Sequence, residues 1–89
     1  MKFKDLRGVL YRINPISICD KETLNYENFL SVKDVPEEYD NLTVCGVGII
    51  DSEFYKIAEG VYSTDKREGE LEFIPCIEIV TPTSPESEF

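Results

Sequence analysis

Carboxylates are the side chains with the most chemistry to offer in this sequence, because 18 of its 89 residues are Asp or Glu and none is His. Paired carboxylates can act as general acid and base, as in the cleavage of glycosidic bonds. With so many acids in a short chain, close pairs arise in any fold and do not indicate a catalytic site. The lack of His also removes the commonest general base near neutral pH. We therefore expect no enzyme activity and no catalytic residues.

Three further features could bind a metal or a phosphate, and each has a simpler structural interpretation. The cysteines lack the short spacings of zinc ligands and lie in predicted strands, where free Cys packs as a small hydrophobe; they are Cys19, Cys45 and Cys76. The Gly-Val-Gly of residues 46–48 lacks the third glycine and the Lys-Ser/Thr of a phosphate loop. Residues 34–40 lack the alternating ligands of a calcium loop. The sequence predicts no cofactor and no metal.

Some of the acids are spaced so that strands would hold them in rows. Glu70 and Glu72 alternate with Leu71 and Phe73, so both carboxylates should leave one face of a strand, about 6.6 to 6.8 Å apart. This separation resembles that of successive phosphates along one nucleic-acid strand. The predicted partner-binding surface consists of Glu53, Glu59, Asp65, Glu68, Glu70 and Glu72. A second acidic cluster consists of Glu37, Glu38 and Asp40.

The elements before the middle of the chain are short. Apolar residues at helical spacing predict a helix over residues 3–13, although residues 9–13 also alternate as a strand would. Clean alternation predicts a strand over residues 16–20, and a weaker pattern predicts a second one within residues 26–32. A proline followed by two acids predicts a short helical turn near residues 36–40.

A hairpin over residues 42–57, turning at Asp51-Ser52, is the central feature of the predicted sheet. Residues 58–63 extend its second strand, residues 64–69 form a charged loop, and Pro75 marks an edge or a bulge in a last strand. The predicted fold class is α+β, with the N-terminal helix packed on a four- to five-stranded, mostly antiparallel sheet. It forms a single domain over residues 1–80. Two prolines and two acids predict a disordered acidic C-terminal tail over residues 81–89.

The formal net charge of −9 excludes several classes of partner. Such a field repels phosphate backbones and anionic lipid, so we expect no direct binding to nucleic acid. The charge also exceeds the magnitude of about 2 to 8 that keeps a small domain in solution. Four of the nine bases gather in the first twelve residues, as Lys2, Lys4, Arg7 and Arg12. No apolar run approaches the ~20 residues of a membrane span, and the charged N-terminus is unlike a signal peptide, so we expect a cytoplasmic protein with no membrane contact.

Four segments together resemble small acidic proteins carried by phages and prophages of Gram-positive bacteria. They are residues 3–10 (Phe-Lys-Asp-Leu-Arg-Gly-Val-Leu), residues 16–20 (Ile-Ser-Ile-Cys-Asp), residues 32–39 (Val-Lys-Asp-Val-Pro-Glu-Glu-Tyr) and a final hairpin. Some proteins of that kind, including anti-CRISPR proteins, block host defence complexes by mimicking nucleic acid or plugging its binding channel. The resemblance covers the first half of the chain and has no diagnostic motif, so it assigns no functional residue.

The charge pattern and the resemblance together predict a non-enzymatic, protein-binding inhibitor or adaptor. Its acidic surface would engage a basic nucleic-acid-handling protein, such as a defence nuclease complex in a bacterial host cell. The alternative is a self-associating structural module of a phage or mobile element, which pairs through an exposed sheet edge and uses no nucleic-acid mimicry. A homo-oligomer is expected under that alternative.

Overall fold

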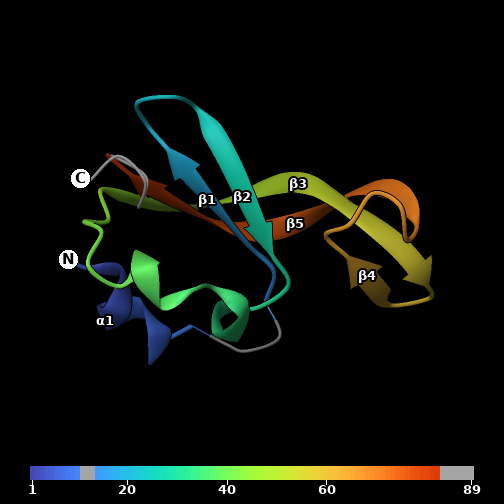
Figure 1. Ribbon diagram of the computed structural model, residues 1–89, viewed down its shortest axis with the longest axis horizontal. Coiled ribbons are helices and arrows are strands. Elements are labelled where there is room, and N and C mark those ends of the chain that lie inside the picture. Colours follow the sequence, from blue (N-terminus) through green and yellow to red (C-terminus); the bar gives the residue numbers. More distant parts are fainter. Residues whose placement is uncertain (11–13, 83–89) are drawn as a thin grey trace.

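A computed structural model describes residues 1–10 and 14–82 as one helix, two 3-10 turns and a curled five-stranded sheet (Figure 1). The elements are α1 (Phe3–Arg7), β1 (Ile16–Asp20), β2 (Asn25–Phe29), η1 (Val32–Asp34), η2 (Glu37–Tyr39), β3 (Gly46–Ala58), β4 (Val61–Ser63) and β5 (Glu70–Thr81). The strand order is β2-β1-β5-β3-β4. Because β1 runs parallel to β5, the sheet is mixed, whereas the sequence predicted a mostly antiparallel one. The coarse expectation of a helix packed on a small sheet holds.

The helix is shorter than predicted, since α1 ends at Arg7 and Gly8 caps it with φ −83° and ψ −12°. Glycine in a helix interior costs about 1 kcal/mol relative to Ala, which favours an end at this position. Residues 11–13 of the predicted helix lie outside the described residues. The short turn predicted near residues 36–40 is present as η2, and η1 precedes it without having been predicted.

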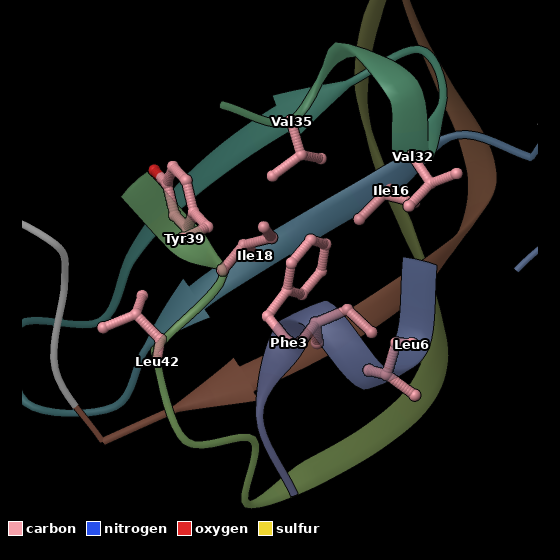
Figure 2. Close-up of a cluster of buried hydrophobic side chains, with 9 residues drawn as sticks. Phe3, Leu6, Ile16, Ile18, Val32, Val35, Tyr39 and Leu42 are labelled. Carbon is pink, nitrogen blue, oxygen red and sulfur yellow. The ribbon is translucent and has the colours of Figure 1, made fainter. Parts of the chain in front are cut away.

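The core face of the sheet carries alternate residues of β1 and β5, and α1, η1 and η2 cover it (Figures 1 and 2). Phe3 lies at its centre with no exposed surface, and its ring meets Tyr39 edge-on at 6.5 Å between centroids. Tyr39 meets Phe29 in the same way at 5.8 Å. The buried cluster consists of Phe3, Leu6, Ile16, Ile18, Val32, Val35, Tyr39, Leu42 and Ile79.

The opposite, inner face of the sheet is buried by its own curl. Asn28 of β2 donates its Nδ2 hydrogen to the Glu53 carbonyl of β3 at 2.9 Å, and Ser52 donates its hydroxyl to Asn28 Oδ1 at 3.2 Å. These bonds join two strands that are three positions apart in the sheet. The inner face includes the buried residues Ser17, Cys19, Ser52, Phe54 and Cys76. The small domain therefore buries side chains on both faces of one sheet.

The predicted turn at Asp51-Ser52 is wrong, because β3 runs straight through it. Asp51 pairs with Pro75 and Ser52 with Ile74 in an unbroken ladder between β3 and β5. The chain turns instead at Gly60, whose φ of +74° suits glycine, and β4 then runs back along β3. The Asp-Ser pair offers no such residue, and the long partner strand β5 favours continued pairing.

Pro75 lies in β5, the central strand of the sheet, and its register with β3 is unshifted, so it marks neither an edge strand nor a bulge as predicted. At Pro75, however, β5 has no neighbouring strand on the side of β1, because β1 pairs with it only from Ile77 onward. The Ile77 amide donates to the Pro15 carbonyl at 3.0 Å, just where β1 begins opposite Ile77. Because amides two residues apart point the same way, the Pro75 nitrogen faces the β1 side before β1 starts, where no hydrogen bond is required. β5 ends at Thr81, one residue beyond the predicted domain boundary, and residues 83–89 lie outside the described residues.

Two of the three cysteines pack as predicted. Cys19 and Cys76 are buried in β1 and β5, and burial raises the pKa of the Cys76 thiol. The prediction was wrong for Cys45, which is exposed and lies just before β3 instead of inside a strand. Sequence alternation does not reveal that the ladder with β5 starts only at Gly46.

Gly69 is required where the chain crosses from β4 to β5. A Cβ atom at this position would lie 2.3 Å from the Lys56 carbonyl oxygen, closer than any real contact. We expect Gly69→Ala to lower the free energy of unfolding by about 1–3 kcal/mol, measured by chemical denaturation. Gly8→Ala is the control, because Gly8 has nothing within 4 Å of such an atom and an ordinary φ. It should be neutral or stabilise the fold by about 0.4–1 kcal/mol. Equal effects of the two changes would contradict the predicted close approach.

Candidate acidic partner-binding surface

β3 and β5 pair antiparallel and are called here the β3–β5 hairpin, although β4 lies between them in the chain. Glu53, Glu70 and Glu72 lie on its two strands, and Glu59, Asp65 and Glu68 lie in the turns on either side of β4, at the end of the sheet that projects away from α1 (Figure 1). The register pairs Lys56 with Glu70 and Phe54 with Glu72, so Glu70 and Glu72 leave the same, inner side of β5. Glu53 pairs with Phe73 and leaves the other side. The six acids therefore do not form a single surface.

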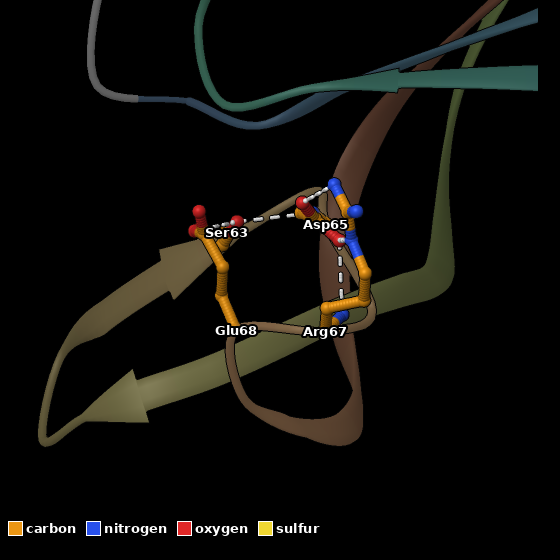
Figure 3. Close-up of polar contacts among 4 residues, drawn as sticks. All are labelled: Ser63, Asp65, Arg67 and Glu68. Atoms are coloured by element: carbon orange, nitrogen blue, oxygen red, sulfur yellow. Dashed lines mark hydrogen bonds and ion pairs between the residues drawn. The ribbon is translucent and has the colours of Figure 1, made fainter.

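Hydroxyl groups hold three carboxylates of this hairpin in place. Tyr62 donates to Glu72 Oε2 at 2.6 Å, and Ser63 donates to Glu68 Oε2 at 2.7 Å (Figure 3). Tyr26 of β2 donates to Glu78 Oε2 at 3.1 Å. The bond to Glu72 raises the pKa of Tyr62, because ionising the phenol would place two negative charges together. A neutral donor orients each carboxylate without cancelling its negative charge.

Two other predicted acids form ion pairs at the surface. Arg67 donates to Asp65 Oδ2 at 2.8 Å and lowers the pKa of that carboxyl (Figure 3). Lys56 lies 2.9 Å from Glu59 Oε2, which raises the pKa of Lys56. Both pairs are largely exposed, so each contributes little to stability. They also reduce the charge that Asp65 and Glu59 can offer to a partner.

Glu53 and Glu70 remain as exposed acids whose carboxylates accept no hydrogen bond from the residues described here. Outside the strand ladder, the one hydrogen bond of Glu53 to the described residues is accepted by its backbone carbonyl from the Asn28 side chain. These two side chains therefore offer full charges to a partner, although they lie on opposite faces of the hairpin.

The second predicted cluster has a divided role. Glu37 and Glu38 are exposed on η2, where no basic side chain accompanies them in the turn. Asp40 is half-buried and accepts a hydrogen bond from Arg7 Nε at 2.5 Å. Asp40 thus joins α1 to the η2 segment and is a structural residue, so only Glu37 and Glu38 face solvent.

Sequence reasoning missed Glu78 and Tyr26 as part of the acidic surface. They lie 52 residues apart in the sequence and meet because β2 and β5 flank β1, with both side chains on the same face of the sheet. Hydrogen bonds with Cys19 and Glu78 raise the pKa of Tyr26 to about 12. Glu78 alternates with two isoleucines, which signals a strand residue but gives no indication of its partner.

Among residues 1–10 and 14–82, no group of three or more Cys, Asp and Glu side chains is placed to hold a metal ion. In the same ranges, no helix combines the length and apolar character needed to cross a membrane. What the arrangement can do is present oriented negative charge to another macromolecule.

Comparison with known proteins gives no relative for this chain, since no family model, no curated protein and no solved structure matches it.

Proposed function

We propose that this protein is a non-enzymatic inhibitor or adaptor that binds a basic, nucleic-acid-handling protein through the acidic end of its sheet. One observation carries the proposal: neutral hydroxyl donors from β2 and β4 hold Glu68, Glu72 and Glu78 in fixed orientations. Carboxylates that are only solubilising need no such positioning.

The charge of the hairpin supports the same proposal. Residues 46–82 contain eight acids and three bases, for a formal net charge of −5. Two of the three bases, Lys56 and Arg67, already pair with Glu59 and Asp65. The other acids therefore face solvent with an uncompensated field, which attracts a basic surface and speeds encounter with it.

Pre-ordered acids also lower the cost of binding. Fixing a flexible Glu side chain on association costs about 0.5–1.5 kcal/mol, and a side chain already held in place avoids part of that cost. Glu70 and Glu72 leave one side of β5 at a strand spacing of about 6.8 Å, close to that of successive phosphates. This spacing supports competition with nucleic acid for the partner's basic groove, which is also the mechanism implied by the resemblance noted in the sequence.

Affinity capture from a bacterial lysate tests the proposal. The immobilised protein is eluted in parallel with a salt gradient and with excess duplex or guide nucleic acid. We expect a nucleic-acid-binding protein to be retained, and to be released by both. Acidic mimicry would be ruled out as the mechanism if no such protein were captured, or if nucleic acid did not displace the captured partner.

A matched pair of charge variants assigns the surface. Glu70→Gln with Glu72→Gln removes two charges from one side of β5, and Glu37→Gln with Glu38→Gln removes two from η2. The first pair should weaken binding to the captured protein about twofold to thirtyfold at low salt, and less at high salt. Equal weakening by the two pairs would show that net charge matters and the position of the acids does not.

Self-association is the second candidate function, and the open edge of β2 favours it. β2 pairs only with β1, and three of its five residues, Asn25, Tyr26 and Glu27, are exposed. Such an edge can add a strand from a second copy. Light scattering over a range of concentrations tests this candidate, because edge pairing predicts a mass that rises with concentration.

A further inference from the structure

An uncovered strip of apolar side chains lies beside the acids, where sequence alternation alone would place core residues. It consists of Val47, Ile49, Leu71, Phe73 and Pro75, all of them exposed, together with Asp51 and Glu53. Ile49 is 79% exposed and Phe73 is 59% exposed. The helical layer covers Ile77 and Ile79 on the same face but does not reach these residues.

The register makes this strip one continuous surface. Ile49 pairs with Ile77, Asp51 with Pro75, and Glu53 with Phe73, so the seven residues lie on one face of two adjacent strands. An apolar row on β5 therefore runs beside Ile49 and two acids on β3. Large apolar side chains exposed together in this way mark an interaction surface.

One depression gives the strip a shape. Ile49, Pro75 and Ile77 border a mainly apolar depression of about 180 Å³. Asp51 and Glu53 follow Ile49 on the same face of β3, and neither carboxylate has a side-chain partner within the described residues. An apolar anchor fits the depression, and a cation beside it would meet the two acids.

An exposed apolar sheet face could bind either a second copy of the chain or a different protein, and the charge of the strip distinguishes between the two. A second copy of the chain in a two-fold arrangement would bring its own Asp51 and Glu53 against this face, and the strip contains no base to compensate them. Like charges that meet in this way oppose association. A partner with Lys or Arg beside its apolar side chains meets no such repulsion.

We infer that the uncovered strip docks an extended segment of the partner protein in which a large apolar side chain is followed, two residues later, by Arg or Lys. Ile49, Asp51 and Glu53 stand two residues apart along β3, or about 6.8 Å. An extended segment that lies along the strand repeats this spacing. The inference rests on the proposed function, because it describes how the partner of the acidic hairpin is anchored.

Defined peptides test the inference without the partner. The probe is a short capped peptide in which serine alternates with phenylalanine, arginine, leucine and arginine. One control peptide replaces its arginines with glutamate, and the other replaces its apolar residues with serine. Amide shifts of the ¹⁵N-labelled full chain are followed by NMR. We expect shifts confined to residues 47–53 and 71–77 with the probe, and binding at least about fivefold weaker with either control peptide.

Variants of the strip sharpen the test. Phe73→Ser, and separately Asp51→Asn with Glu53→Gln, should each weaken binding of the probe about fivefold. Val9→Ser removes an equally exposed apolar side chain elsewhere and should leave binding unchanged. Retained dispersion of the amide spectrum shows that each variant folds.

Several results would overturn the inference. These are no binding of the probe, shifts outside the strip, equal binding of the glutamate peptide, or unchanged binding by the Phe73→Ser variant. A dimer whose interface maps to the strip without peptide would make a second copy the occupant instead. Failure here, with a partner still captured and displaced by nucleic acid, would leave the proposed function standing. Failure of the capture with the probe still bound would remove the nucleic-acid competitor and keep the docking strip.

Discussion

Phe54→Ala should lower the free energy of unfolding by about 3–5 kcal/mol, because the Phe54 side chain has no exposed surface. Truncating a buried phenylalanine removes its transfer free energy and leaves a cavity that the surrounding side chains fill only in part. A domain of this size is stabilised by about 5–15 kcal/mol in total, so the variant should be close to unfolding. Urea denaturation followed by circular dichroism measures the change. Phe54→Leu, a smaller truncation, keeps the test readable if the alanine variant does not fold.

Phe73→Ala is the matched control for this prediction. Phe73 lies on the neighbouring strand of the same hairpin and is 59% exposed, so its loss should cost less than about 1 kcal/mol. A large loss at Phe73 with a small loss at Phe54 would mean that the hairpin presents the opposite face to solvent. That result would also remove the uncovered strip as a docking surface.

The contrast between Phe54 and Phe73 shows where sequence reasoning stops. Phe54 stands among aromatic and β-branched residues and Phe73 ends a Leu-Glu-Phe alternation, and both segments are correctly predicted as strands. Patterning cannot decide which face the rest of the fold covers, because α1 and the two 3-10 turns reach only one end of the sheet. Leu71 and Phe73 thus remain more exposed than Glu72, which lies against Tyr62.

Local signals were sufficient for some elements and not for others. Residues 16–20 form the predicted strand, and the proline followed by two acids forms the predicted turn η2. The turn predicted at Asp51-Ser52 is absent. Asp-Ser is compatible with a turn but does not require one, and β3 continues as a strand because residues 46–56 all pair with β5. The parallel pairing of β1 with β5 joins residues about 60 positions apart, and no local pattern encodes it.

The sequence predicts the acidic composition of the candidate site but not the arrangement of its carboxylates. An excess of acids in residues 46–82 is plain from the sequence, and the structure places Glu59, Asp65, Glu68, Glu70 and Glu72 around β4 at one end of the sheet but Glu78 beside β1. The sequence does not show which acids accept hydroxyl hydrogen bonds, which pair with bases and which are open to solvent. These differences depend on contacts between separate strands and loops. The N-terminal bases show the same limit, because Arg7 counts as one more surface charge until its contacts are known.

Arg7→Ala should lower the free energy of unfolding by about 3–4 kcal/mol, which is far more than a surface base contributes. The guanidinium of Arg7 donates to Asp40 Oδ1 at 2.5 Å and to three backbone carbonyls, those of Val32, Val35 and Pro36, at 2.8 to 3.1 Å. Its Cζ atom also lies 5.0 Å from the centre of the Phe3 ring. The Arg7 and Asp40 side chains are only 25% and 29% exposed, so removing the cation leaves a partly desolvated carboxylate unpaired.

Arg7→Lys distinguishes charge from geometry. A lysine keeps the positive charge but cannot reach several acceptors with one planar fork, so most of the loss should remain. Lys4→Ala is the control, because Lys4 is an exposed base of the same helix and should cost less than about 0.5 kcal/mol. If Arg7→Ala and Lys4→Ala had equal effects in urea denaturation, Arg7 would be an ordinary surface base. The larger loss is expected because α1 has only five residues, and the Arg7 contacts fasten it to the two 3-10 turns that complete the core.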